Sequence, residues 1–99
     1  MSTKPNDDTA RFEATITGRV QGVGFRHFTR TSARELDLEG WVRNEPDGSV
    51  TVIAEGSKRQ LEKLEEKVSE GPRTARVDGI DVDWTEARDE FDTFQVRFH

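Results

Sequence analysis

The sequence predicts an α+β protein with a ferredoxin-like βαββαβ sandwich, in which two helices cover one face of an antiparallel sheet and a short extra strand follows at the C-terminus. Two observations lead to this prediction. Stretches of alternating apolar and polar residues, typical of half-buried strands, occur five times along the 99 residues. Two further stretches carry apolar residues at helical spacing, and the order is strand, helix, strand, strand, helix, strand, strand.

The first strand is expected at residues 11–17, where apolar and polar side chains alternate. A loop with glycines, residues 18–24, separates it from a helix expected at residues 25–38. The strand residues that should face inward are Phe12, Ala14 and Ile16.

A hairpin should follow the first helix. Residues 40–44 and 50–54 have the alternation of two strands, and residues 45–48, Glu-Pro-Asp-Gly, form a strong turn signal between them. Proline presets φ early in such a turn, and glycine tolerates positive φ at its end. We therefore expect the second and third strands to pair with each other.

The second helix should begin after Ser57, because Ser57 and Gln60 form a capping box. It should end at the Gly-Pro pair, residues 71–72. Alternation then predicts a fourth strand at residues 80–85 and a short last strand at residues 94–98. The helix residues expected to face the core are Leu61, Leu64 and Val68.

The chain is acidic, with a net charge of −5. Nucleic acids and anionic membranes are polyanions, so this charge argues against a general surface for either. Any anion-binding site must therefore depend on positive charges and hydrogen-bond donors close to the ligand, because the charge of the whole protein repels anions. Eleven arginines stand against four lysines. A lysine-poor acidic surface fits adaptation to high salt, where screening relieves self-repulsion, and equally fits an ordinary acidic cytosolic protein with drifted composition.

The length is that of one domain, which we expect to span residues 11–99 after a disordered N-terminal leader at residues 1–10. The sequence has no cysteine, which excludes disulfides, a thiol nucleophile and cysteine metal sites. It has no apolar run of the roughly 20 residues that a membrane span requires, and no signal peptide. We expect a cytoplasmic monomer that contacts neither membranes nor nucleic acid.

The most informative segment is Gly-Arg-Val-Gln-Gly-Val-Gly-Phe-Arg, residues 18–26. A glycine-rich turn between a strand and the start of a helix can aim several backbone N–H groups at one point, a geometry that suits an oxyanion such as phosphate. Arg26 adds a planar fork of donors that matches two phosphate oxygens. The segment therefore predicts a phosphate-binding loop that carries its own arginine.

This segment, together with Gly-Trp-Val-Arg-Asn at residues 40–44 and the glycines and valine that follow at Gly48, Val50 and Gly56, resembles the acylphosphatase family. The resemblance extends over nearly all of residues 12–99. It implies a ferredoxin-like fold, in agreement with the element order. One departure is Asp37, because the family often has glycine at this helix end and aspartate tolerates the left-handed conformation less well.

The resemblance implies hydrolysis of the carboxyl–phosphate bond of small acyl phosphates, with no metal and no organic cofactor. It assigns the catalytic roles to Arg26 and Asn44, where the neutral side-chain oxygen of Asn44 would orient the attacking water. The predicted phosphate-binding residues are Gln21, Gly22, Val23, Gly24, Phe25 and Arg26. The Gln21 side chain fits two roles, contact with the ligand or a hydrogen bond to the backbone of its own loop.

Two other functions fit part of the pattern. An RNA-recognition module has the same βαββαβ order, and residues 21–28 partly match its glycine–aromatic signature, although that signature lies on the third strand and here the stretch follows the first. A module that binds an acyl or carbamoyl phosphate without turnover is the second alternative. Such a module would be expected to lack Asn44, which is present.

Overall fold

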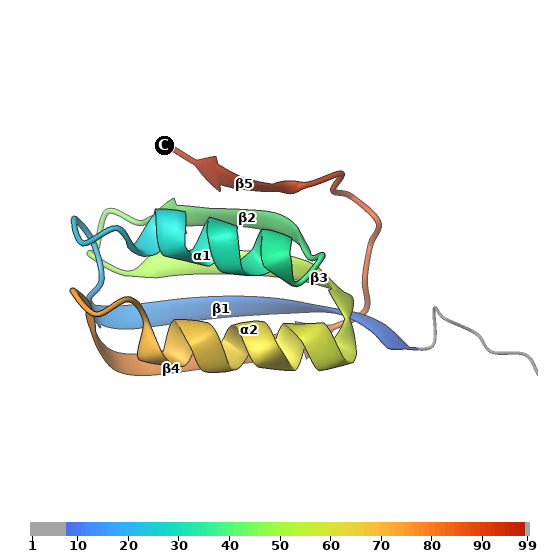
Figure 1. The fold of residues 1–99 in the computed structure, drawn as a ribbon, viewed down its shortest axis with the longest axis horizontal. Helices are drawn as coiled ribbons and strands as arrows, with labels where there is room; N and C mark the ends of the chain where they lie inside the picture. The colour runs from blue at the N-terminus through green and yellow to red at the C-terminus, as the bar shows by residue number, and fades with distance from the viewer. Residues whose placement is uncertain (1–7, 99) are drawn as a thin grey trace, which may run out of the picture.

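The computed structural model describes residues 8–98 and has the predicted order of helices and strands (Figure 1). The elements are β1 (Thr9–Arg19), α1 (Phe25–Glu35), β2 (Glu39–Asn44), β3 (Val50–Ser57), α2 (Lys58–Glu70), β4 (Arg76–Thr85) and β5 (Phe94–Arg97). Both helices lie on the same face of one sheet, as predicted.

The sheet has five strands in the order β4-β1-β3-β2-β5. The pairs β1–β4, β1–β3 and β2–β3 are antiparallel, whereas β2 and β5 are parallel. The ferredoxin-like sandwich and its extra strand are therefore confirmed, but the sheet is mixed rather than antiparallel. The reason is the connection from β4, which carries the chain from one edge of the sheet to the other before β5 begins.

The strand directions determine which segments meet. β3 lies between β1 and β2 and is antiparallel to both. The C-terminal ends of β1 and β2 therefore lie at the same end of the strands. The loop after β1 therefore lies near Asn44, the last residue of β2. β5 is parallel to β2 and places Arg97 opposite Arg43, so Phe98 lies at the same end of the strands. Three segments far apart in sequence converge there.

The core lies between the sheet and the helices, and it contains the residues that alternation placed there. The inward residues of β1 are Phe12, Ala14 and Ile16, each at most 1% exposed. Those of α2 are Leu61, Leu64 and Val68, all fully buried. Burying a Leu or Val side chain contributes about 1.5–3 kcal/mol, so this layer stabilises the sheet and helices that carry the site.

The first strand is longer than predicted. Thr9 and Ala10 belong to β1 and pair with Ser57 and Gly56, so the expected leader at residues 1–10 is too long by these two residues. Of its remainder, residues 1–7 lie outside the described residues. At the other end β1 continues through Arg19, and β4 begins earlier than expected to pair with it. Polar and glycine residues in these extensions hid the alternation.

The first helix is shorter than predicted and ends at Glu35. Asp37 has φ of 58°, its N–H bonds to the Arg34 oxygen at 3.1 Å, and the Leu38 N–H bonds to the Ala33 oxygen at 2.9 Å. These are the two hydrogen bonds of a Schellman motif. Aspartate therefore occupies the left-handed position that usually holds glycine.

A buried ion pair fixes the position of the connection between β4 and β5. Arg11 Nη1 lies 2.9 Å from Glu55 Oε2, and both side chains are less than a tenth exposed. Glu55 also accepts the backbone N–H groups of Arg88 and Asp89 at 2.9 and 3.0 Å. Burial alone would lower the pKa of Arg11, but its hydrogen bonds to Glu55, Glu13 and Glu90 raise the pKa above its ordinary value. The guanidinium is thus charged and bonded to three carboxylates.

Candidate active site

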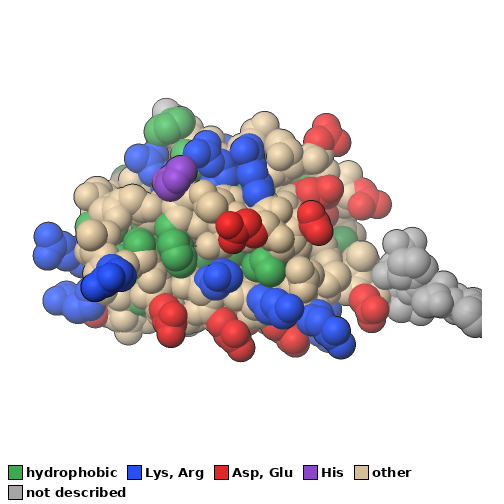
Figure 2. Space-filling view, in the orientation of Figure 1, with side chains coloured by type: hydrophobic (Ala, Val, Ile, Leu, Met, Phe, Trp, Pro, Cys, Tyr) green, Lys and Arg blue, Asp and Glu red, His purple; other side chains and the backbone are tan. Residues whose placement is uncertain are grey.

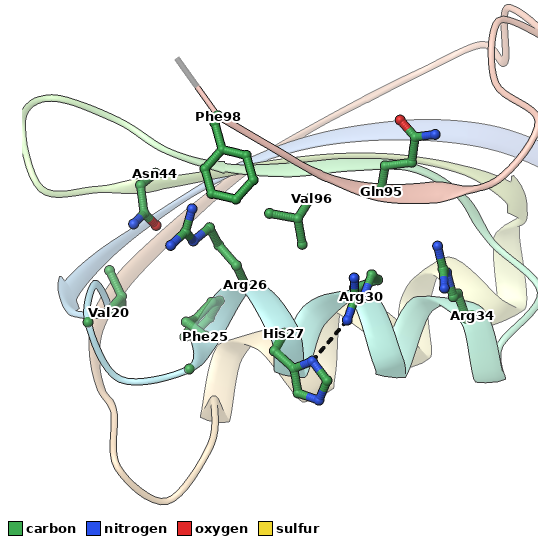
Figure 3. Close-up of a pocket in the computed structure, with 12 residues that line it drawn as sticks. Val20, Phe25, Arg26, His27, Arg30, Arg34, Asn44, Gln95, Val96 and Phe98 are labelled. Atoms are coloured by element: carbon green, nitrogen blue, oxygen red, sulfur yellow. Dashed lines mark hydrogen bonds between the residues drawn. The ribbon is translucent and has the colours of Figure 1, made fainter.

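A cavity of about 510 Å³ opens where the loop after β1, the start of α1 and the ends of β2 and β5 converge (Figure 3). Its size is within the roughly 300–1,000 Å³ typical of small-molecule sites. The lining residues are Val20, Gly22, Gly24, Phe25, Arg26, His27, Arg30, Arg34, Asn44, Gln95, Val96 and Phe98.

Two glycines with left-handed backbone conformation connect the loop to α1. Gly22 and Gly24 have φ of 74° and 80°, a region that costs other residues about 1–2 kcal/mol. Gly24 is the N-cap of α1, and no side chain caps this helix end. The first turn also has no acidic residue. Backbone N–H groups at an uncapped helix N-terminus, with the positive end of the helix dipole, favour an anion.

The loop is held on two sides by side-chain hydrogen bonds. Gln21 Nε2 donates to the main-chain oxygens of Glu45 and Ser49 at 2.7 and 2.9 Å, and Thr74 Oγ1 donates to the Val23 oxygen at 2.7 Å. The Gln21 side chain therefore bonds backbone, one of its two expected roles, although that backbone is the hairpin turn and not its own loop. The loop is thereby joined to the strand that ends in Asn44.

Arg26 lies one residue inside α1 and extends toward β2 and β5. Its guanidinium carbon lies 4.9 Å from the centre of the Phe98 ring, and Figure 3 shows the group between Phe98 and Asn44. Among the described residues, no carboxylate forms an ion pair with Arg26. A cation held by an aromatic face but not neutralised by a carboxylate keeps its hydrogen-bond donors for a ligand.

Asn44 ends β2 with its side chain directed at the cavity (Figure 3). Its Oδ1 is the buried side-chain polar atom of residues 8–98 that has no hydrogen-bond partner. A buried acceptor left in this state costs about 1–3 kcal/mol, and native proteins rarely tolerate it without a functional reason. Because the Asn44 side chain lines the cavity, a water or substrate donor that reached this oxygen would satisfy it.

The cavity brings together most of the predicted site residues. Those that line it are Gly22, Gly24, Phe25, Arg26 and Asn44. Gln21 and Val23 do not line it, because Gln21 bonds the hairpin and Val23 packs against the core.

Several lining residues had not been predicted as part of the site. Arg30 and Arg34 follow Arg26 at intervals of four, a spacing that puts them on the same side of a helix and could have indicated them from sequence. Val96 and Phe98 had no such signal, because only the parallel pairing of β5 with β2 brings them to the cavity.

The lining is basic although the chain is acidic. Three arginines and a histidine contribute to it, and none of the lining residues is Asp or Glu. Figure 2 shows Lys and Arg side chains gathered beside the histidine, over α1 and β5. The local field therefore favours an anion despite the net charge of −5.

The described residues give no sign of other kinds of site. Within residues 8–98 no group of three or more His, Cys, Asp or Glu side chains is placed to hold a metal ion. None of the described helices has the length and apolar character needed to cross a membrane.

Comparisons with known proteins agree with this geometry. The family model described as Acylphosphatase matches residues 12–96. An acylphosphatase of Salinibacter ruber is 64% identical over 87 residues, which are 88% of this chain and 92% of that protein. The crystal structure of an acylphosphatase from Bacillus subtilis has a TM-score of 0.86 at 34% identity, over 89% of this chain and 98% of the other.

The same fold also occurs inside a larger protein. Full-length HypF in a phosphate- and nucleotide-bound form matches with a TM-score of 0.82 and 29% identity. The match covers 90% of this chain but 12% of HypF. The acylphosphatases of Salinibacter ruber and Bacillus subtilis, by contrast, match along more than nine-tenths of their own length.

Proposed function

This chain belongs to the acylphosphatase family, and we propose that it hydrolyses the carboxyl–phosphate bond of small acyl phosphates by in-line attack of water. Water oxygen bonds to phosphorus, the bond from phosphorus to the acyl oxygen breaks, and the acyl group leaves as a carboxylate. The water proton passes to a phosphate oxygen. The observation that carries the proposal is the buried, unpartnered Oδ1 of Asn44 in the cavity that also contains Arg26.

The phosphate is held by the loop and Arg26. The backbone N–H groups from Gly22 to Arg26 lie around the uncapped start of α1. They bind two or three oxygens of the phosphate. The guanidinium binds the remaining charge. In phosphoryl transfer the charge is spread over three equatorial oxygens, and an arginine placed there contributes about 10³–10⁵ in rate.

Asn44 orients the water. Its Oδ1 accepts a hydrogen bond from the water and aims a lone pair of the water at phosphorus. A neutral amide suits this place, because a carboxylate would repel the phosphate. The Gln21 bonds to Glu45 and Ser49 support the geometry, since they tie the phosphate loop to the strand that carries Asn44. Positioning of this kind is worth several kcal/mol in well-oriented reactions.

The leaving group requires little help. A carboxylate is a stable anion at neutral pH, so its departure needs no strong general acid. We therefore propose a reaction that uses no metal ion and no organic cofactor, in which catalysis rests on electrostatics and orientation.

Release of inorganic phosphate from benzoyl phosphate tests the proposal. With excess chelator, the parent and an Arg59→Ala control should both be active, because Arg59 lies on α2 outside the cavity lining. Arg26→Ala should lose about 10³-fold or more in kcat/KM. Reaction in ¹⁸O-labelled water should place the label in phosphate. Activity that needs Mg²⁺, or that survives Arg26→Ala, would contradict the proposal.

The phosphate-release assay, together with binding measurements, separates the alternative functions. A module that only binds acyl or carbamoyl phosphate would retain benzoyl phosphate without releasing phosphate from it. An RNA-recognition module would bind RNA in a salt-sensitive manner with no turnover. We propose further that the protein acts as a cytoplasmic monomer without nucleic-acid partners, and sedimentation at working concentration tests the monomer.

A further inference from the structure

We propose that the outer part of the cavity binds a second negative charge, so that the preferred substrates are acyl phosphates whose acyl group itself carries a carboxylate or phosphate, with Arg30 as the selecting residue. This inference rests on the proposed hydrolysis of acyl phosphates and specifies which acyl groups the enzyme favours.

The cavity is larger than its proposed catalytic part. In the proposed reaction the phosphate binds at the loop beside Arg26 and Asn44, which line the cavity near the start of α1. From there the cavity of about 510 Å³ continues along α1, where Arg30 and Arg34 also line it. Since one water takes up about 30 Å³ in the liquid, this space exceeds what a phosphate with a short acyl group would fill.

A row of positive charge follows the cavity outward. Arg26, Arg30 and Arg34 recur every four residues on one side of α1, and each step advances about 6 Å along the helix axis. Like charges at this spacing destabilise a helix by a few tenths of a kcal/mol, and no described carboxylate is paired with any of the three. A ligand with two separated negative charges would relieve this repulsion.

Arg30 is held in position for such a ligand. One of its terminal nitrogens, Nη2, donates to Nδ1 of His27 at 3.1 Å, and both side chains line the cavity (Figure 3). Arg34 donates Nε to the Phe94 oxygen at 3.0 Å and extends toward β5. Both hydrogen bonds leave donors for an anion, because a guanidinium has five.

The opposite wall suits the carbon part of the acyl group. Val96 and Phe98 of the β5 segment line the cavity across from α1, and Phe98 is 74% exposed. An acyl chain or ring would pack on these side chains while its terminal charge met Arg30. A wholly apolar acyl group would cover the arginines without satisfying them, which costs free energy.

A pair of para-substituted benzoyl phosphates tests the inference. In 4-carboxybenzoyl phosphate the ring carries a carboxylate, and in 4-nitrobenzoyl phosphate it carries an uncharged group of the same shape. The measured quantity is the ratio of kcat/KM for the carboxy compound to kcat/KM for the nitro compound. In Arg30→Gln this ratio should fall about tenfold or more relative to the parent, the scale of one hydrogen bond to a charged group. Comparing ratios between enzymes cancels the different intrinsic reactivities of the two compounds.

Two further variants complete the experiment. Arg30→Lys should keep most of the ratio, since the charge remains. Arg59→Gln removes the same charge from α2, outside the cavity lining, and should leave the ratio unchanged. If Arg30→Gln leaves the ratio at the parent value while the parent hydrolyses benzoyl phosphate, the second-charge site is wrong and the proposed function stands. If the parent releases no phosphate from benzoyl phosphate or from either substituted compound, both are overturned.

Discussion

The side-chain amide of Gln21 lies 2.7 Å from the main-chain oxygen of Glu45, the residue that follows Asn44. A second hydrogen bond from the same nitrogen reaches the Ser49 oxygen at 2.9 Å. One side chain thus joins the loop after β1, the proposed phosphate-binding loop, to the hairpin that carries the proposed water-orienting residue. The relative position of the two halves of the site depends on this connection.

Replacing Gln21 with alanine should therefore affect both stability and turnover. The loss of two hydrogen bonds leaves two carbonyl oxygens without this partner, so the free energy of unfolding should fall by about 1–3 kcal/mol. The value of kcat should fall further than the affinity for inorganic phosphate, because the loop amides remain. Urea unfolding and steady-state kinetics measure these effects. Gln60→Ala, which removes one 3.4 Å hydrogen bond outside the cavity, is the control and should keep kcat.

Replacing Asn44 with alanine should separate activity from stability. Its Oδ1 is buried without a partner, so removal of the amide should leave the free energy of unfolding unchanged or raise it by up to about 1–3 kcal/mol. The value of kcat should fall at least about 10²-fold, the scale of losing one oriented polar group. A variant that unfolds more easily and still turns over benzoyl phosphate at the parent rate would show that Asn44 is structural.

Replacing Phe98 with leucine should weaken the site without disturbing the fold. The ring lies over the Arg26 guanidinium at 4.9 Å and is mostly exposed, so it contributes about 0.5–1 kcal/mol to holding this cation. We expect kcat/KM for benzoyl phosphate to fall about twofold to fivefold, with the thermal midpoint within a degree or two of the parent. Phe98→Tyr keeps the aromatic face and should retain the parent value. Equal losses in both variants would contradict the cation–π role.

Replacing Asp37 with glycine should stabilise the protein. Asp37 occupies the left-handed position of the Schellman motif with φ of 58°, which costs an L-residue about 1–2 kcal/mol. The greater flexibility of glycine in the unfolded chain offsets about 0.4–1 kcal/mol of this gain. The expected result is a rise in unfolding free energy of up to about 1 kcal/mol in urea, with unchanged kinetics. A loss of stability would mean that the aspartate has a favourable role at this helix end.

The contribution of Asp47 to the stability of the hairpin turn should be lost in strong acid, where its carboxylate is protonated. Its Oδ1 accepts the Ser49 hydroxyl at 2.6 Å and the Ser49 N–H at 3.0 Å, and these bonds hold the pKa of Asp47 below its ordinary value of 3.8. A lowered folded-state pKa means that the contribution is complete above pH 3.8 and is lost as the pH falls through the lower, folded-state pKa. The difference in thermal midpoint between the parent and Asp47→Ala should therefore be largest near neutral pH and shrink in strong acid. A difference that grows on acidification would have the wrong sign.

Much of the candidate site could be predicted from the sequence. The spacing of Gly22, Gly24 and Arg26 between a strand and a helix indicated an anion loop, and the resemblance singled out Asn44. The structure places these residues around one cavity. The Gln21 side chain was the ambiguous case, because its partner carbonyls lie about 25 residues further along the chain, and no local pattern could identify them.

The sequence by itself determined the elements, because alternation, helical spacing, the Ser57 cap and the turn after Asn44 act over a few residues. The tertiary structure decided the rest: the parallel placement of β5, the burial of the Arg11–Glu55 pair, and the position of Val96 and Phe98 at the cavity. Strand pairing and cavity lining depend on contacts between residues distant in sequence. Such contacts are selected by the packing of the whole core, which short-range patterns do not encode.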